Sequence, residues 1–287
     1  MWDTNLPKRI TVIARLYSKY MRLSGYQPHY FPRLHYVQRV LDSDLFELSD
    51  YLQFVRKHEF PLPQGGTKRG KSFQAHASIK LANGIFYLVI PTVDRLQSIT
   101  TTPIVYQPDW TQKHLASIRS GYGRASQFRV LFPEVETLLS EQYASLGELT
   151  IKTVLWSIMR VITDEPMAQF SLSAVNQLLS KTKHPFRLQK IVLGSETKVA
   201  APTGNPSQWI IDLCRKLNAT EYITGGTAGA AYMDFELFKK FNIRVMVQDW
   251  NCQSYAQQYP KVGFLPNLSA LDLIFNEPLH VRQRILG

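Results

Sequence analysis

A six-residue motif, QPHYFP at residues 27–32, places an amide, an imidazole and two aromatic rings between prolines. Each proline fixes its own φ and biases the preceding residue toward extended geometry, so we expect a stiff turn with Gln27 and Phe31 extended. Such a turn can hold a substrate site, with Gln27 and Tyr30 contacting the ligand and His29 transferring a proton. The alternative is a rigid strand-to-helix turn whose aromatic rings only enter the core.

Two polar side chains, Asp50 and Gln53, follow the motif closely in sequence. A carboxylate beside His29 would orient the imidazole as a general base, and the Gln53 amide would help to orient an acceptor. The commoner role of such an aspartate is a helix cap or a surface residue. The sequence alone does not decide between these two roles of Asp50.

A glycine-rich turn, TGGTAG at residues 224–229, lies between a predicted strand and a predicted helix. Glycines let backbone N–H groups approach an anion, and the helix N-terminus adds positive potential, so a phosphate or carboxylate would fit. The turn has neither P-loop nor dinucleotide spacing, and a plain tight turn is the alternative. The expected ligand contacts from this segment are Thr224, Gly225, Gly229, Tyr232 and Asp234, although Asp234 would also suit the helix dipole alone.

The two cysteines differ in their surroundings. Cys252 follows a predicted strand in polar company and can act as a nucleophile if a histidine lies within reach. Cys214 falls on the apolar face of a predicted helix, which favours a buried structural thiol. Two cysteines are too few for a disulfide scaffold or a cysteine zinc cluster, and the histidines lack metal-ligand spacing. We expect no metal and no cofactor.

The composition narrows the class of protein. The chain has 287 residues, of which 45% are hydrophobic and 19% charged, as in ordinary globular proteins. We expect no membrane span and no signal peptide, and therefore a cytoplasmic protein. The net charge of +11 favours anionic partners, such as nucleic acid, phosphorylated metabolites, an acidic carrier protein or a membrane surface.

The elements that must position these residues alternate between helices and strands. An Asn83-Gly84 pair predicts a β-hairpin, and strand-helix-strand periodicity over 221–247 predicts a parallel βαβ unit, whose carboxyl edge is the usual ligand site. Apolar periodicity and turn signals predict helices over 10–23 (ending at Gly25), 36–41, 109–122, 148–162, 205–217, 230–241 and 269–275, a helix opening at Pro133, and loops over 58–72 and 194–206. The 58–72 loop is basic and expected to be mobile.

These elements predict an α/β fold with a mixed sheet, a β-hairpin, a helical middle section and a βαβ-like C-terminal third. We expect residues 1–22 to form an N-terminal helical extension and residues 23–287 to form one compact unit. The motifs at 27–32 and 224–229 would then converge on one cleft.

The ordered series of motifs resembles the WbqC-like protein family of bacteria. The resemblance runs from about Leu23 onward, and it rests on residues 27–32 with Tyr36, then 50–54, 79–84 with 89–91, 110–122, 222–234 and 268–276. It implies an enzyme of surface-polysaccharide or related biosynthesis that transfers an acyl or aminoacyl group, such as glycyl, onto an amine of a sugar or similar acceptor. Lys80 belongs to the quoted motifs and joins the expected substrate contacts. The chain departs from the family pattern at Tyr26, Arg33, His35, His76 and Ala77.

The leading hypothesis is therefore a small-molecule transferase in which His29 or Cys252 handles the proton or the acyl group, while Asp50 and Gln53 orient the acceptor. Its substrate would be a small molecule, free, carrier-bound or nucleotide-linked. The alternative is a non-catalytic protein that binds nucleic acid or another anion, as the net charge of +11 favours. No nucleic-acid recognition module is visible in the sequence.

Overall fold

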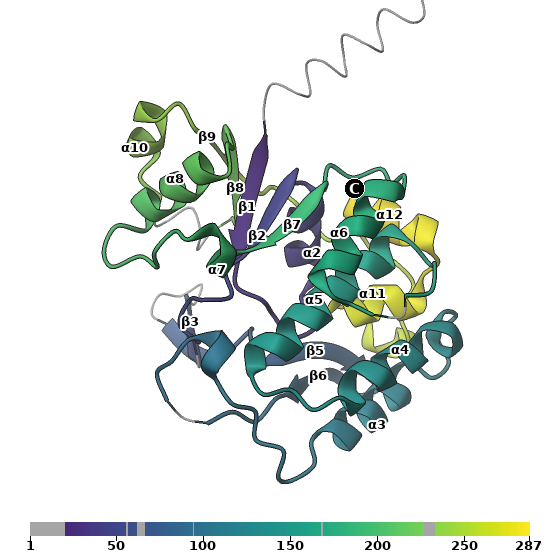
Figure 1. Cartoon of the computed structure of the whole chain (residues 1–287). Coiled ribbons are helices and arrows are strands. Elements are labelled where there is room, and N and C mark those ends of the chain that lie inside the picture. Colours follow the sequence, from purple (N-terminus) through teal and green to yellow (C-terminus); the bar gives the residue numbers. More distant parts are fainter. Residues whose placement is uncertain (1–20, 56, 62–66, 94, 168, 227–232) are drawn as a thin grey trace, which may run out of the picture.

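A five-stranded parallel sheet forms the centre of the protein. The computed structural model describes residues 21–287 except 56, 62–66, 94, 168 and 227–232. The strand order is β7-β2-β1-β8-β9, and every neighbouring pair is parallel (Figure 1). The strand bounds are β1 Arg22–Tyr26, β2 Leu45–Leu48, β7 Lys190–Leu193, β8 Glu221–Thr224 and β9 Arg244–Val247.

In chain order this is the 3-2-1-4-5 arrangement of a doubly wound sheet, whose direction of winding reverses between β1 and β8. The reversal places helices on both faces. Helix α2 (Leu34–Leu41) lies on one side, while α8 (Pro206–Lys216) and α10 (Phe235–Lys240) lie on the other (Figure 1).

Each face of the sheet has its own hydrophobic core. On the α2 side, Tyr36 and Val37 pack with Phe46 of β2 in a core that continues into the helical section. On the opposite side, Ile211 and Cys214 of α8 belong to a second cluster. Its other buried members are Leu23, Leu45, Ile210, Leu213, Ala219, Tyr222, Phe238 and Ile243. Interior parallel strands are buried on both faces, and the interior strand β2 (LFEL) is apolar apart from Glu47.

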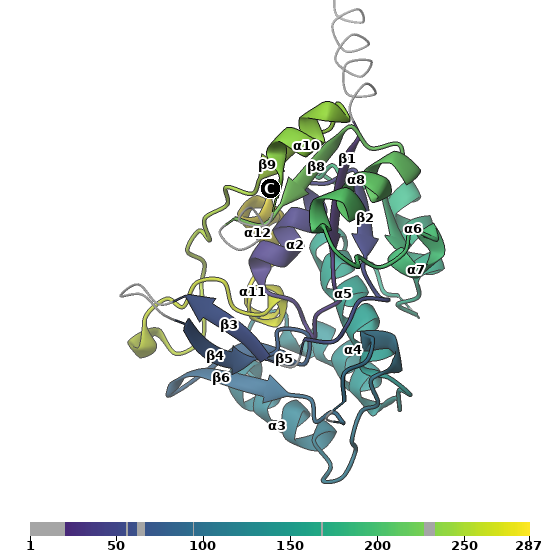
Figure 2. The same cartoon turned by 90° about the vertical axis from the view of Figure 1, so that its left-hand side faces the viewer.

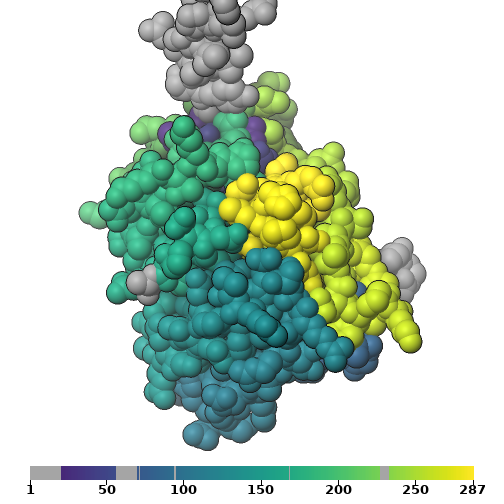
Figure 3. Space-filling view, turned by 90° about the vertical axis from the view of Figure 1, so that its right-hand side faces the viewer, coloured from purple at the N-terminus to yellow at the C-terminus, as the bar shows by residue number. Residues whose placement is uncertain are grey.

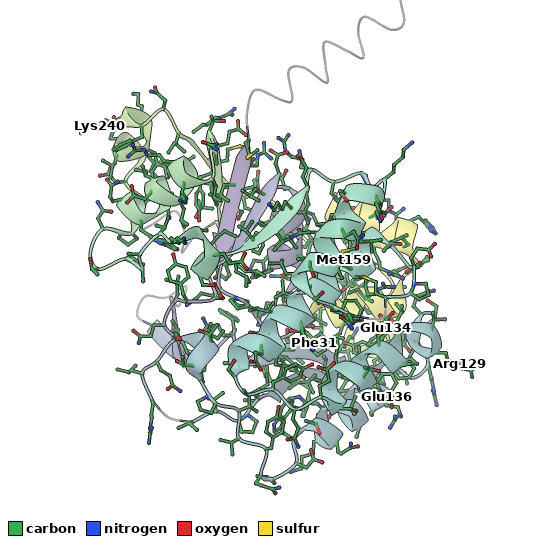
Figure 4. All side chains as sticks on the ribbon, in the orientation of Figure 1. Phe31, Arg129, Glu134, Glu136, Met159 and Lys240 are labelled. Atoms are coloured by element: carbon green, nitrogen blue, oxygen red, sulfur yellow. The ribbon has the colours of Figure 1, made fainter. Side chains whose placement is uncertain are left out.

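The middle of the chain is helical, as expected. Its helices are α3 Thr111–Tyr122, α4 Phe128–Ser140, α5 Leu146–Ile162 and α6 Leu172–Lys181. The C-terminal helices α11 (Ala270–Asn276) and α12 (Leu279–Leu286) pack against α5, and Figure 3 shows these last residues in yellow, seated against the teal helical section. Trp156 and Met159 of α5 are fully buried, which confirms their predicted core role; Figure 4 shows Met159 on α5 and Phe31 beside it.

Two antiparallel pairs lie below the sheet in both Figure 1 and Figure 2. They are β3 (Lys57–Pro61) with β4 (Thr67–Lys71), and β5 (His76–Leu81) with β6 (Gly84–Val89). The second pair is the predicted hairpin, and Gly84 at its turn has a φ of 109°, which a residue with a side chain rarely adopts. The short elements are α7 Gly194–Thr197, η1 Ile99–Thr101 and η2 Pro260–Val262.

The α/β class, the helical middle section and the parallel β8-α10-β9 unit are confirmed. The Asn205 cap of α8 is also confirmed, because its Oδ1 accepts a 2.9 Å hydrogen bond from the Ser207 backbone N–H. Among the described residues, no helix is long and apolar enough to cross a membrane. The prediction of one compact unit for 23–287 stays a prediction.

Four predictions of secondary structure were wrong. Arg22–Tyr26 is a strand, so a helix over 10–23 cannot continue to Gly25; residues 10–20 lie outside the described residues. The 58–72 segment contains the paired strands β3 and β4 instead of loop alone, because backbone pairing does not require an apolar pattern. The 194–206 segment begins with the short helix α7. Pro133 lies inside α4 instead of opening it.

Burial explains why α4 begins before its proline. Phe128, Leu131 and Phe132 all precede Pro133 and are at least 93% buried, and the rings of Phe128 and Phe132 stack with centroids 4.4 Å apart. The stabilisation from burying this first turn outweighs the backbone hydrogen bond that the proline cannot donate.

Phe31 was expected to be extended, and it has a φ of 37°. Its backbone is held from both sides: the N–H donates to Thr153 Oγ1 at 3.2 Å, and the carbonyl accepts from Ser269 Oγ at 2.9 Å. Its ring is 1% exposed and meets Trp156 edge-on, with centroids 5.6 Å apart. These contacts from two distant helices override the local preference.

Candidate functional site

The carboxyl edge of the parallel sheet brings together polar residues from distant parts of the sequence. Gln27 follows β1, Asp50 follows β2, Gly194 follows β7 and Gly225 follows β8. In doubly wound sheets, ligands bind outside this edge at the point where the strand order reverses, which here lies between β1 and β8. We therefore place the candidate functional site at this edge.

The Glu47 side chain of β2 packs against Gly25 and Gly194. It is 0% exposed, and it fills space that side chains at Gly25 and Gly194 would occupy; a Cβ at Gly25 would come within 2.7 Å of Glu47 Oε2. Oε2 accepts a 2.6 Å hydrogen bond from Ser49 Oγ, while Oε1 has no hydrogen-bond partner within the described part of the chain. Burial raises the pKa of Glu47 to about 8, against the lowering effect of the Ser49 hydrogen bond.

Arg39 of α2 is the second unusual group. Its side chain points from the helix toward the β1–β8 boundary and is 3% exposed. The guanidinium lies over the Tyr26 ring, 4.5 Å from the ring centroid, and a Cβ at Gly225 would overlap its Nη1. Arg39 therefore occupies the point at which the winding of the sheet reverses.

Two of the predicted contacts meet directly. Gln27 Nε2 donates a 2.8 Å hydrogen bond to the backbone carbonyl of Gln53, which joins the end of β1 to the segment after β2. Asp50 joins β2 to β7, because its Oδ1 and Oδ2 accept from the Ser195 N–H at 2.8 Å and the Ser195 hydroxyl at 2.7 Å. The catalytic role of Asp50 stays a prediction, and both of its oxygens already have this structural use.

His29 lies among aromatic rings. It is 5% exposed, and its ring centroid is 5.0 Å from that of Tyr26, 4.9 Å from Tyr36 and 6.1 Å from Phe73. The Arg39 guanidinium lies over the same Tyr26 ring that His29 contacts. The proton-transfer role of His29 stays a prediction.

Tyr30 and Lys80 lie away from the sheet edge, in the core. Tyr30 is 0% exposed, and its hydroxyl forms a 3.0 Å hydrogen bond with His114 Nδ1 of α3. Lys80 of β5 is 1% exposed, and its Nζ donates to the Gly263 carbonyl at 2.6 Å and to Gln257 Oε1 at 3.2 Å. Burial lowers the pKa of Lys80, although the nearby Asp272 carboxylate opposes that shift. Their role as substrate contacts stays a prediction.

Cys252 lies near the N-terminal end of α2. Its Sγ accepts a 3.3 Å hydrogen bond from the Asn267 N–H, and Asn267 Oδ1 in turn accepts from His35 Nδ1 at 3.0 Å. Cys252 and His35 thus share Asn267 as a hydrogen-bond partner, but they do not bond each other directly, and the role of Cys252 as a nucleophile stays a prediction. Burial raises the pKa of the Cys252 thiol and lowers that of His35 to about 4, so both groups are neutral at pH 7.

The residues predicted around the glycine turn divide into three groups. Thr224 and Gly225 lie at the end of β8, beside β1. Asp234 caps α10, since its Oδ1 accepts a 3.0 Å hydrogen bond from the Leu237 N–H, and this is the helix-terminal role considered as its alternative. Gly229 and Tyr232 lie outside the described residues.

Sequence reasoning missed Glu47, Arg39 and Ser195. The first two carried a signal: Glu47 interrupts the apolar strand LFEL, and Arg39 lies between apolar residues of an amphipathic helix. A charged side chain in an element that must be buried on both faces is itself buried, and such residues gather at functional sites. Ser195 carried no comparable signal.

One of the comparisons with known proteins found a match. The sequence model described as the WbqC-like protein family matches residues 27–283 of the chain. Neither the curated proteins nor the solved structures contain a match. Within the described residues, no group of three His, Cys, Asp or Glu side chains is arranged to hold a metal ion.

Proposed function

The chain belongs to the WbqC-like protein family, and we propose that it is a transferase that moves an acyl or aminoacyl group, such as glycyl, onto an amine of a sugar or similar acceptor. The pathway would be polysaccharide or specialised-metabolite biosynthesis. The observation that carries the proposal is the buried carboxyl group of Glu47 at the carboxyl edge of the sheet, with Oε1 unpaired among the described residues.

Amine acylation needs a base with a pKa near the working pH, because an ammonium group cannot attack a carbonyl carbon. Glu47 has a pKa of about 8, set by burial. In the proposed step the acceptor nitrogen attacks the carbonyl carbon of the donor, and the bond from that carbon to the leaving group breaks. The proton lost by the nitrogen passes to Glu47 Oε1 and then to the leaving group.

Neighbouring residues position Glu47 or offer alternative catalytic groups. The Asp50–Ser195 hydrogen bonds hold the ends of β2 and β7 together, so the strand that carries Glu47 is fixed at its carboxyl end. His29 is the second candidate for the proton transfer and Cys252 for a covalent acyl intermediate. A route through Cys252 requires loss of its proton, which the raised pKa of the thiol opposes.

The test is a transfer assay with glycyl thioester as donor and a panel of free and nucleotide-linked amino sugars as acceptors, read by mass spectrometry as the gain of one glycyl residue. We expect Glu47→Gln to lower kcat/KM by a factor of about 10² to 10⁴, the usual contribution of a general base. The wild-type kcat/KM should rise with pH toward about 8, and this rise should vanish in the variant.

The matched control is Glu236→Gln, which removes the charge of an exposed glutamate on α10. It should retain wild-type turnover and the wild-type pH profile. Unchanged turnover in Glu47→Gln would refute the role of this carboxylate, and the same assay on His29→Ala and Cys252→Ser would then assign the proton or acyl transfer to the other candidates.

The second candidate function is non-catalytic binding of nucleic acid or another polyanion, which the net charge of +11 favours. Binding of this type weakens steeply as salt is added. Salt-sensitive affinity for RNA or DNA, together with no transfer to any acceptor, would favour this candidate over the transferase.

A further inference from the structure

Arg39 is a buried cation without a counter-ion in the described part of the chain. Its Nε has no hydrogen-bond partner, and its guanidinium makes no ion pair with a described residue; the ring of Tyr26 is its one aromatic contact there. The other deeply buried arginines have carboxylates. Arg160 faces Glu134 at 3.5 Å, and Arg282 faces Asp164 at 2.9 Å.

A buried charge without a partner is unfavourable, and contact with an aromatic ring offsets this only in part. One further cation, Arg33, is the N-cap residue of the same helix. Burial, with smaller effects from Arg39 and Arg33, lowers the pKa of His35 to about 4, so this imidazole is neutral at pH 7 and offers Arg39 no negative partner. Glu47 lies at the same edge of the sheet, but burial keeps its carboxyl group largely protonated at pH 7, and it forms no ion pair with Arg39. The site therefore favours an anion.

The position of Arg39 in the sheet indicates which kind of anion would bind. Arg39 lies at the boundary of β1 and β8, between the Tyr26 ring and Gly225, whose missing side chain leaves the space that Nη1 occupies. At this point of a doubly wound sheet, the phosphate groups of ligands are the typical occupants. A guanidinium presents paired N–H donors that match a phosphate, and backbone groups at a glycine can approach it closely.

We propose that Arg39 and the backbone at Gly225 form a phosphate subsite, so that the substrate of this protein is a phosphorylated molecule. The inference deepens the proposed transferase function and rests on it for the role of that molecule as donor or acceptor. Two sources supply the same chemistry: a nucleoside diphosphate, or the phosphopantetheine arm of a carrier.

The first experiment measures binding by calorimetry with pyrophosphate, UDP and 4′-phosphopantetheine on the full chain. We expect binding of at least one of them, with Kd raised about tenfold or more in Arg39→Met, since that variant loses a charge-assisted hydrogen-bonding group. Tightest binding of UDP assigns the phosphate to a nucleotide, and tightest binding of 4′-phosphopantetheine assigns it to a carrier.

Two further variants separate binding from folding. Gly225→Ala keeps the arginine and places a Cβ where Nη1 lies, so it should also weaken phosphate binding. Arg119→Met removes an exposed arginine paired with Glu136 and should bind as the wild type does. Arg39→Met replaces an unpaired buried charge by an apolar side chain, so its ligand-free melting temperature should equal or exceed that of the wild type.

The proposal is overturned if the wild type binds none of the three compounds at millimolar concentration, or if Arg39→Met binds them as tightly as the wild type. Glu47→Gln distinguishes this inference from the proposed function. It should lose transfer and retain phosphate binding, whereas active transfer from donors and acceptors without phosphate, with no phosphate binding, would remove the subsite and leave the transferase intact.

Discussion

At the scale of single residues, Glu47 couples folding to pH. The pKa of its carboxyl group is about 8 in the folded protein and 4.5 in the reference state, so between these values the folded protein binds more protons than the unfolded chain. The free energy of unfolding then falls as pH rises from about 5 to about 8. We expect Glu47→Gln to lose this dependence, and urea unfolding at half-unit pH intervals measures it.

The control for this prediction is again Glu236→Gln, whose exposed carboxyl group should leave the pH dependence as it is in the wild type. The informative quantity is the difference between wild type and Glu47→Gln, because other titrating groups contribute equally to both. A difference that stays constant from pH 5 to pH 8 would contradict the raised pKa.

The two thiols should differ in reactivity. Burial raises the pKa of Cys214 to about 12, and this side chain is 0% exposed, while Cys252 is partly exposed with a less strongly raised pKa. We expect iodoacetamide at pH 8 to modify Cys252 more slowly than free cysteine, and Cys214 only after unfolding in urea. Peptide mass spectrometry over time measures both rates. Modification of Cys252 faster than free cysteine would instead indicate an activated nucleophile.

The sequence was informative about the place of the site and less so about its charges. Gly225 was identified because the glycine-rich turn follows a predicted strand, and Gln27 because residues 27–32 combine polar and aromatic side chains with two prolines. The two residues do lie at the ends of β8 and β1. Glu47 and Arg39 were missed because periodicity assigns charged positions of a helix or strand to the solvent side. That assignment fails for an interior parallel strand, which has no solvent side.

At the scale of elements, the β5–β6 hairpin depends on Gly84. Its φ of 109° suits glycine, and a Cβ there would meet no atom within 4 Å, so backbone strain is the whole cost of a side chain. We expect Gly84→Ala to lower the free energy of unfolding by about 1–3 kcal/mol. Thermal and urea unfolding measure the change.

Gly204 provides the matched control, since a Cβ there also meets no atom within 4 Å and its φ is not positive. Gly204→Ala should leave stability unchanged or raise it by up to about 1 kcal/mol, because alanine reduces the entropy of the unfolded chain. Equal effects of the two substitutions would argue against the hairpin conformation described here.

Arg282 of helix α12 links this helix to the helical section through an ion pair and hydrogen bonds. This side chain is 0% exposed, pairs with Asp164 at 2.9 Å and donates to the carbonyls of Glu277 and Arg160. Arg282→Ala leaves these two carbonyls without their donor and creates a cavity, so we expect it to lower the free energy of unfolding by about 2–4 kcal/mol. Arg284 of the same helix is exposed, and Arg284→Ala should change stability by less than about 0.5 kcal/mol. Chemical denaturation compares the two variants.

Elements with a clear period were predictable, and those fixed by distant contacts were not. Helix α5 and hairpin β5–β6 were found from local pattern. The start of α4 before Pro133 and the φ of Phe31 depend on burial against α5 and α11, which local sequence does not report. Tertiary contacts override local preference at both positions.

At the scale of the whole molecule, β1 is the central strand and pairs with β2 and β8. A chain that ends at Gly204 lacks α8, β8, α10, β9, η2, α11 and α12, and with them most of the second core and one partner of β1. We expect this truncated chain to lack a cooperative thermal transition and to aggregate, because β1 would present an edge of unpaired backbone N–H and C=O groups. Calorimetry and light scattering would reveal a stable truncated fold if the expectation is wrong.

The order of the strands lay beyond prediction. Local pattern predicted the parallel β8-α10-β9 unit, since its strands are close in sequence. The pairing of β2 with β7 spans the entire helical section, and no residue in either strand identifies the other as its neighbour. Long-range pairing follows from the global packing of helices on both faces of the sheet.

The pairing of β1 with β8 has a consequence for the folding of this protein during its own translation. Arg22 of β1 hydrogen-bonds to Glu221 of β8 across 199 positions of the sequence, so during translation the ribosome makes the first partner long before the second. At elongation rates of about 5–20 residues per second, the nascent chain waits some ten to forty seconds with that edge of β1 open. Chaperones that shield apolar strands on the ribosome should therefore matter most for this protein during that interval, and slower translation should lower its soluble yield.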